Sequence, residues 1–347
     1  MGQSETASAG GREIIVSFPL SDPHNMHERG TVARDFRLRK HLAGYRKEAS
    51  DLLIDLQNAN LLPCRAEEVT LLAEGRVNYC SGYFGDGDKK RFLKVAPGDL
   101  ERRYYEHAIA NRIRCRGDHF VVPQCKYIRS AHGLNIFAFE WMDELDAQRD
   151  NSLDICRTRG LGEYNAVNLV SSDKKKLTGV PTHPGFIRDT TVQVLADLGF
   201  ETNILEAQEE IISRWPAVGA VLAKGPLALS VRDSSRANVL VQRDKAVMID
   251  NGAAHYAPMG FDLWSYLDTN EDMIKTAEKL STVYMDSAPF RDLGLASEFV
   301  AISSVAASCI IGLDRFVRNK AYHKPKRIIA LQFAALKLIE ICENGGN

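Results

Sequence analysis

The chain has 347 residues, which is long enough for two lobes or domains with a sizeable core. Its formal net charge of −1 and the lack of a basic stripe with interleaved aromatic residues argue against nucleic-acid binding. Its seven cysteines include no Cys-x-x-Cys pair, which favours reduced thiols over disulfides or a zinc site.

Residues 1–65 predict an N-terminal tail followed by one extra helix. The opening residues lack the basic start and apolar core of a signal peptide, so we expect a cytoplasmic protein. Residues 44–59 then place Leu52, Leu53 and Leu56 at helical spacing. This amphipathic helix should pack on the part of the chain that follows it.

Residues 66–143 begin with short strands over 69–73, 81–84 and 91–95. The first turn between them contains Gly75 and Asn78. Lys94 lies inside the third apolar strand, and an unpaired buried charge costs several kcal/mol. We therefore expect Lys94 to have a negatively charged partner.

A helix over 99–114 follows and carries two acidic candidates for that partner. Glu101 falls in the first turn, where the helix dipole already accounts for an acid. Glu106 is expected on the strand-facing side, although a surface pair with Arg102 or Arg103 stays open.

The next segments are strands over 120–123, 126–130 and 135–141, followed by a polar stretch over 145–190. Its composition predicts loops, as an insertion or a mobile lid. Helices are expected over 189–198, 203–215, 269–285, 296–317 and 326–343. The apolar stretch 295–313 contains Glu298 and several serines, which favours a buried helix over a membrane span.

Three polar residues interrupt apolar sequence between 226 and 264: Asp233, Asn238 and Asp250. Residues 238–241 and 246–249 predict two strands joined by a polar turn, a hairpin that brings Asn238 next to Asp250. One amide and one carboxylate suit Mg²⁺, which prefers few protein ligands plus substrate phosphates. Asp233 is placed to accept or orient the proton of an attacking hydroxyl.

These residues resemble a known family. The order Val231-Arg232-Asp233-x-x-x-x-Asn238, then Asp250-Asn251-Gly252 and Gly260-Phe261-Asp262-Leu263, is similar to the aminoglycoside phosphotransferase and choline kinase group. The resemblance implies a bilobal α+β protein-kinase-like fold with a small antiparallel-sheet N-lobe over 66–143 and a larger, mainly helical C-lobe over 144–347.

The resemblance also implies a kinase that uses ATP and Mg²⁺. Lys94, fixed by Glu106, would hold the phosphates beneath the loop at Gly75 and Asn78, while backbone groups near Glu140 and Met142 would bind adenine. Asn238 and Asp250 would hold the metal, and Asp233 would orient the acceptor hydroxyl. Arg232 or Arg236 would neutralise the transferred group or pair with a nearby acid. Asp262 would brace the catalytic loop.

Two departures keep alternatives open. Val231 stands where the family has a His, and the phosphate loop has few glycines. A catalytically inactive nucleotide-binding or scaffolding protein would show both features. A protein kinase is the other alternative, although no Ala-Pro-Glu segment follows Asp250. The first choice is a kinase acting on a small-molecule hydroxyl of the aminoglycoside, sugar, amino alcohol or nucleoside type, with no nucleic-acid or membrane partner.

Overall fold

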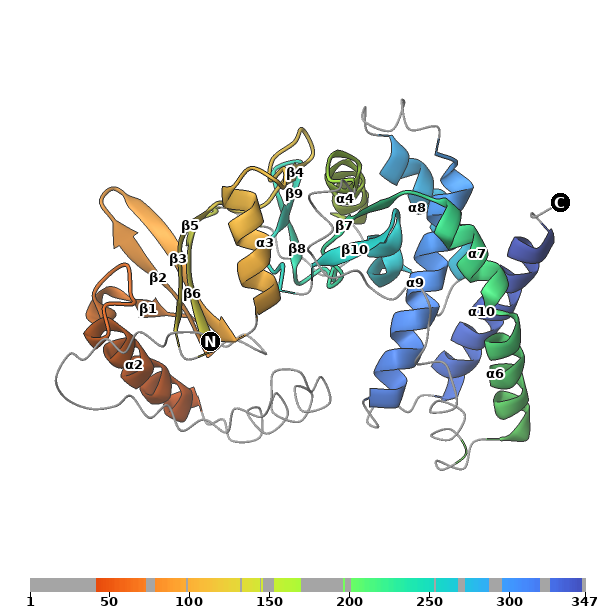
Figure 1. Ribbon diagram of the computed structural model, residues 1–347, viewed down its shortest axis with the longest axis horizontal. Coiled ribbons are helices and arrows are strands. Elements are labelled where there is room, and N and C mark those ends of the chain that lie inside the picture. Colours follow the sequence, from red (N-terminus) through yellow and green to blue (C-terminus); the bar gives the residue numbers. More distant parts are fainter. Residues whose placement is uncertain are drawn as a thin grey trace, which may run out of the picture.

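The computed structural model describes most of the chain from residue 42 onward (Figure 1). The described residues are 42–72, 79–97, 99–131, 133–143, 145, 153–169, 196, 201–252, 254–267, 272–286, 295–318 and 325–344. Within them the chain forms a bilobal α+β fold, with an antiparallel sheet in one lobe and mainly helices in the other. The predicted boundaries at 65/66 and 143/144 stay predictions.

The N-terminal lobe is built on one five-stranded sheet of order β1-β2-β3-β6-β5, with every neighbouring pair antiparallel. Its strands are β1 (Thr70–Leu71), β2 (Cys80–Asp86), β3 (Lys89–Pro97), β5 (Cys125–Ala131) and β6 (Leu134–Glu140). The predicted strands at 81–84, 91–95, 126–130 and 135–141 all fall within or on these elements.

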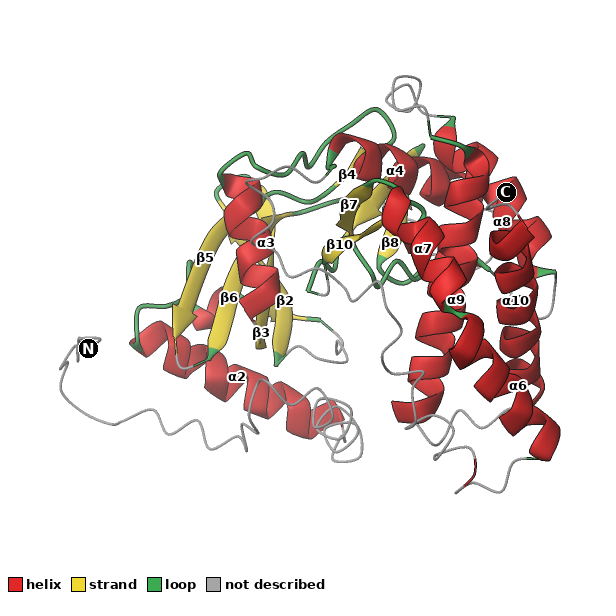
Figure 2. Ribbon diagram, turned by 45° about the vertical axis from the view of Figure 1, so that its right-hand side comes forward, coloured by secondary structure: helices red, strands yellow, loops and turns green. Residues whose placement is uncertain are grey.

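One helix covers each face of this sheet, as Figure 2 shows. Helix α2 (Leu42–Asn58) packs its leucines against β3 and β6 residues such as Leu93 and Ile136, which confirms the predicted amphipathic helix. Helix α3 (Asp99–Ile109) packs on the other face, where Tyr105 meets Phe137 and Phe139. Alternate residues of a strand point to opposite faces, so each central strand contributes to both layers.

The second lobe opens with two small sheets beside the helices. The hairpin β8 (Val239–Gln242) and β9 (Lys245–Met248) confirms the predicted hairpin, and β4 (Phe120–Val121) runs parallel to β9. β7 (Leu227–Ser230) pairs antiparallel with β10 (His255–Pro258), which the sequence pattern did not reveal. Asp233 lies in the segment between β7 and β8, and Asp250 lies in the segment between β9 and β10.

Helices make up the rest of the lobe: α4 (Asp154–Val167), α6 (Thr202–Arg214), α7 (Pro216–Lys224), α8 (Met273–Met285), α9 (Ser297–Arg318) and α10 (Pro325–Asn344), with the 3₁₀ helix η5 (Phe261–Tyr266). Ser303, Ser304 and Ser308 of α9 are buried in the protein, and Ser308 donates to the Trp264 carbonyl at 2.9 Å. Within the described ranges, no helix combines the length and apolar character that crossing a bilayer requires. All seven cysteines are free, in agreement with the prediction of reduced thiols.

The prediction of loops over 145–190 was wrong for its middle part. Residues Asp154–Val167 form helix α4, and much of its surface is buried. The sequence of this helix shows no amphipathic pattern because its buried residues are largely polar, among them Arg157, Glu163 and Asn165. The rest of 145–190, and almost all of the helix predicted over 189–198, lies outside the described residues.

Candidate active site

The site is organised around the ammonium group of Lys94 on β3. In the alternation of that strand, Leu93 and Val95 face α2, so Lys94 points to the α3 side of the sheet. Lys94 is 4% exposed, and its Nζ lies 2.7 Å from Oε1 of Glu101 and 3.3 Å from Oδ1 of Asp250. The contact with Asp250 spans 156 positions in sequence and joins the two lobes.

Charge pairing determines the protonation state of this lysine. Burial by itself lowers the pKa of the Lys94 ammonium, but attraction to Glu101 and Asp250 and the hydrogen bonds to them outweigh burial and raise it above the usual value. Lys94 is therefore a cation at neutral pH. A buried cation at a lobe junction can attract anionic groups such as phosphates.

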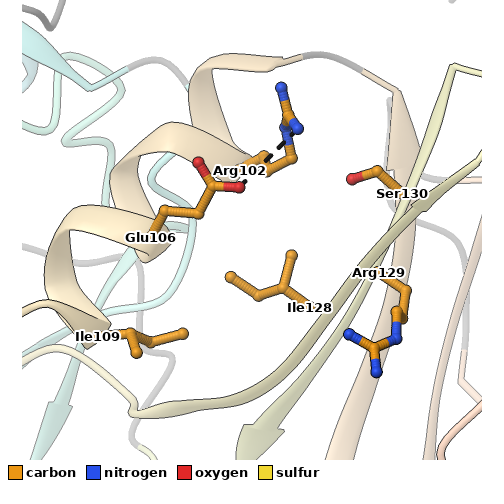
Figure 3. Close-up of a pocket in the computed structure, with 6 residues that line it drawn as sticks. All are labelled: Arg102, Glu106, Ile109, Ile128, Arg129 and Ser130. Atoms are coloured by element: carbon orange, nitrogen blue, oxygen red, sulfur yellow. Dashed lines mark ion pairs between the residues drawn. The ribbon is translucent and has the colours of Figure 1, made fainter. Parts of the chain in front are cut away.

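The predicted partner of Lys94 was wrong. Glu101, the first-turn residue, makes the buried ion pair, whereas Glu106 lies 3.8 Å from Arg102 with its side chain 52% exposed. Figure 3 shows Glu106 and Arg102 together at a cavity of about 440 Å³ between α3 and β5, whose floor includes Ile109 and Ile128. The surface pair with Arg102, the open alternative, is the one that forms.

The loop that carries Asp233 is held in place by hydrogen bonds to residues of η5. The buried carboxylate of Asp262 accepts from Ser230 Oγ at 2.6 Å and from the backbone amides of Val231 and Arg232 at 3.3 and 3.0 Å. Trp264 Nε1 donates to the Arg232 carbonyl at 2.7 Å. These bonds stabilise Arg232 at φ +60°, a left-handed conformation that is uncommon for residues other than glycine. Asp262 thus braces the loop, as the resemblance implied.

The hairpin brings the two predicted metal ligands to one place. Ile249 N donates to the Asn238 carbonyl at 3.0 Å, which sets Asn238 beside the residue before Asp250. Asn238 Nδ2 donates to the Asp233 carbonyl at 3.1 Å, so the amide oxygen is turned away from that bond. The Asp250 side chain is 45% exposed, although one of its oxygens contacts Lys94.

This donor set fits Mg²⁺ better than a transition metal. An amide oxygen and a partly exposed carboxylate are hard ligands, and Mg²⁺ completes its shell with water and substrate phosphates. In the described part of the chain, no group of three or more His, Cys, Asp or Glu residues is arranged to hold a metal by itself. Asn238 and Asp250 would therefore hold such an ion only together with water or phosphate ligands.

A second contact ties α3 to the segment after Asp250. Asn251 is fully buried, and its Nδ2 donates to the Tyr105 hydroxyl at 3.1 Å. Gly252 N donates to Asp250 Oδ1 at 3.2 Å, and a Cβ at Gly252 would lie 3.4 Å from Glu101 Oε2. The backbone at Gly252 thus lies beside the Lys94 ion pair.

The far end of the loop is tied to α4. Arg236 Nη2 and Nε lie 2.5 and 2.9 Å from the carboxylate oxygens of Asp154, the first residue of that helix. Arg157, which is fully buried, contacts the same carboxylate at 3.1 Å and donates to the Val239 carbonyl at 2.9 Å. Of the two readings left open for Arg236, pairing with a nearby acid is the one that the structure contains.

The residues predicted to bind adenine and phosphates are described only in part. The amide of Glu140 donates to the Gln124 carbonyl at 2.9 Å, and its carboxylate accepts from Arg116. The Glu140 amide is thus engaged within the protein. Met142 packs on the apolar cluster of Val121, Leu240 and Val247, which gives that region an apolar surface. Gly75 and Asn78 lie outside the described residues.

The arrangement of the lobes matches solved structures. An ADP-bound aminoglycoside phosphotransferase APH(2'')-Ib superposes with a TM-score of 0.50 at 15% identity, covering 83% of this chain and 96% of that one. The chain has the aminoglycoside phosphotransferase fold. The aminoglycoside phosphotransferase APH(4)-Ia gives a TM-score of 0.52 at 12% identity, with 84% and 98% covered. No protein-family model matches the sequence, and no curated protein matches it by sequence.

Val231, which stands where the family resemblance implies a His, is a core residue of this aminoglycoside phosphotransferase fold and is 1% exposed. Sequence reasoning missed Asp154, Arg157 and the Tyr105–Asn251 contact. The Asp154-x-x-Arg157 spacing is a signal for an ion pair only once the segment is known to be helical. The sequence did not show that Glu101 is buried, and its burial is what identifies it as the partner of Lys94.

Proposed function

We propose that this protein is an ATP- and Mg²⁺-dependent phosphotransferase that acts on a hydroxyl group of a small molecule. The observation that carries the proposal is the Lys94 ammonium, which lies 2.7 Å from Glu101 and 3.3 Å from Asp250. Phosphoryl transfer depends mainly on positioning and charge neutralisation, and this cluster offers both.

Lys94 is the group that would hold the phosphates of ATP. Glu101 fixes the ammonium from the α3 side, and Lys94 also bonds the carboxylate of Asp250, which is a proposed metal ligand. Asn238 and Asp250 would hold Mg²⁺, which neutralises phosphate charge when bound. Asp250 would then interact with both Lys94 and the metal.

Asp233 would orient the acceptor hydroxyl toward the γ-phosphate. Its backbone carbonyl accepts from Asn238 Nδ2 at 3.1 Å, so the proposed base and one metal ligand belong to one hydrogen-bonded loop. A base within reach of the attacking hydroxyl contributes roughly 10²- to 10⁴-fold to such reactions. Arg232 is proposed to help neutralise the transferred group.

The acceptor is proposed to be a small molecule because the two superposed phosphotransferases are named for aminoglycoside acceptors. The sequence lacks one motif of the protein kinases, because no Ala-Pro-Glu segment follows Asp250. Aminoglycosides, sugars, amino alcohols and nucleosides are all candidate acceptors. Gly75, Asn78, Glu140 and Met142 remain proposed contacts for the nucleotide, and the Glu140 amide already donates to the Gln124 carbonyl.

The test begins with nucleotide binding in the whole chain. ATP with Mg²⁺ should raise the melting temperature, and ATP without Mg²⁺ should raise it less. Phosphate transfer is then measured against a panel of aminoglycosides, sugars, amino alcohols and nucleosides. Asp233→Asn should lower transfer by about 10²-fold or more and keep the thermal shift. Absence of any nucleotide-dependent shift in the wild type would refute the proposal.

A kinase-shaped binding protein is the second candidate, and buried Val231 is the observation that favours it. That protein would give a thermal shift with ATP but no transfer to any acceptor. Its ATP consumption would be unchanged by Asp233→Asn. The same two assays therefore separate the candidates.

A further inference from the structure

The catalytic loop is held at two ends by different parts of the lobe. Residues 230–234 are bound by η5, where Asp262, Trp264 and Tyr266 bond to the loop, the last donating to the Ser234 carbonyl at 2.8 Å. Residues 236–239 contact α4 through Arg236 and the Val239 carbonyl. Asn238, the proposed metal ligand, lies in the second part.

One carboxylate joins the contacts of that second part. Asp154 Oδ1 accepts from Arg157 Nη1 at 3.1 Å and from Arg236 Nε at 2.9 Å, and Oδ2 accepts from Arg236 Nη2 at 2.5 Å. Arg157 also donates from Nε to the Val239 carbonyl, so it links Asp154 to Val239. The Asp154 side chain is 11% exposed, so solvent screens these contacts weakly.

The geometry around Arg236 also limits how the loop can move. Its guanidinium carbon lies 5.6 Å from the centroid of the Tyr266 ring, a residue of η5. Two hydrogen bonds from one planar guanidinium to a carboxylate set direction as well as distance. Arg236 is thereby held between α4 and η5, two positions before Asn238.

We propose that Asp154 is a positioning residue for phosphoryl transfer, which acts through Arg236 and Arg157 to hold Asn238 in place beside Asp250. This inference rests on the proposed function. Asp154 touches no reacting atom in this scheme. A displacement of about 1 Å at a group that binds the reacting centre can cost on the order of 10²-fold in rate.

The first test compares Arg236→Gln with a matched control. Arg214 forms a similar pair, with its side chain 32% exposed and Nη2 lying 2.6 Å from Glu343, on α6 away from the loop. Hydrogen exchange of the amides of residues 233–239 is measured without nucleotide. Arg236→Gln should speed exchange of the Asn238 amide, which donates to Ser235 O at 2.7 Å, and Arg214→Gln should leave it unchanged.

The second test measures turnover of ATP and of the best acceptor. Arg236→Gln should lower kcat by about 10- to 100-fold while the KM for ATP changes less than about twofold. Arg236→Lys should recover only part of kcat, because an ammonium lacks the planar fork of donors that matches both carboxylate oxygens. Asp154→Asn should match Arg236→Gln in kcat, and the double variant should add little to either.

The outcomes separate this inference from the proposed function. Unchanged exchange in Arg236→Gln overturns the role of Asp154 whether or not the enzyme turns over. Equal losses of kcat and melting temperature in Arg236→Gln and Arg214→Gln overturn it too, because they indicate general destabilisation. A wild type without turnover refutes the proposed function, and the exchange data still decide whether Asp154 holds the loop.

Discussion

Helix α3 carries two glutamates with opposite environments. Glu101 is 4% exposed and bonds the Lys94 ammonium at 2.7 Å, whereas Glu106 has a half-exposed side chain 3.8 Å from Arg102. At about 100° per residue, five positions turn a helix by roughly 500°, which separates the two side chains by about 140°. One helix face therefore cannot offer both residues to Lys94, and packing on the sheet selects Glu101.

The contrast teaches that the surroundings of a carboxylate decide its role. Two buried charges cost several kcal/mol to desolvate and are kept only when they are well paired. An exposed pair is screened by water and contributes about 0–1 kcal/mol. Glu101 accordingly links the sheet to the site, while Glu106 lines a surface cavity (Figure 3).

The largest expected loss of stability comes from Glu101→Gln. It should reduce phosphotransfer by about 100-fold, because Lys94 loses the group that fixes it. It should also lower the free energy of unfolding by about 3 kcal/mol, since a buried charge loses a partner. Steady-state kinetics and urea denaturation measure the two effects.

Glu106→Gln is the matched control for that variant. We expect activity within about twofold of the wild type and a stability change below about 0.5 kcal/mol. If Glu106→Gln instead damages activity as much as Glu101→Gln, the assignment of the two glutamates is wrong.

The second prediction separates stability from activity at the buried pair. Lys94→Met combined with Glu101→Leu replaces both charges by apolar side chains, which avoids the cost of burying either. We expect a free energy of unfolding within about 1 kcal/mol of the wild-type value. We also expect no ATP-dependent phosphate transfer. Retained transfer would show that Lys94 is not needed to hold the phosphates.

A smaller effect is expected for Tyr105→Phe. The change removes the hydroxyl that accepts from Asn251 Nδ2 and leaves this buried amide short of one bond. Such a loss costs about 1–3 kcal/mol. Activity should fall less than in Glu101→Gln, because Lys94 keeps both carboxylates. A kcat loss equal to that of Glu101→Gln would contradict this order of effects.

The smallest effect is a pH dependence above neutrality. The pKa of Lys94 is raised above 10.5, so the stability it contributes is fully present below that value and is lost as pH rises through the folded-state pKa. The difference in melting temperature between wild type and the double variant Lys94→Met/Glu101→Leu, which leaves no unpaired buried glutamate to titrate, should stay constant from pH 7 to about 10 and then change in favour of the variant.

Glu106→Gln keeps Lys94 and its partners, so its melting curve should follow that of the wild type across the same pH range. A difference between wild type and Lys94→Met/Glu101→Leu that changes already between pH 7 and 9 would show that Lys94 is not held as a cation.

Local patterns were sufficient for much of the candidate site. The hairpin after Asn238 followed from two apolar runs around a polar turn, and the burial of Lys94 followed from its place in an apolar strand. The brace from Asp262 followed from a family resemblance. In each case the decisive residues are close together in the sequence or belong to a short motif.

The sequence failed where polar residues are buried. Helix α4 has no apolar stripe, and Gly160 and Gly162 lower its helical propensity. Those glycines are needed because a Cβ at 160 would lie 2.4 Å from that of Ala246, and one at 162 would collide with the Tyr284 carbonyl. Close packing against neighbours distant in sequence therefore produces a pattern that looks like a loop.

The sequence by itself determined most strands of the N-terminal sheet, the β8–β9 hairpin, the amphipathic helices and the types of residue that could bind phosphate and metal, because these depend on periodicity and side-chain chemistry. Only the tertiary structure decided that Lys94 pairs with Glu101 and that Asp154 joins Arg157 to Arg236. The physical reason is that partner choice depends on which groups lose water together. That loss is set by packing between segments distant in the chain.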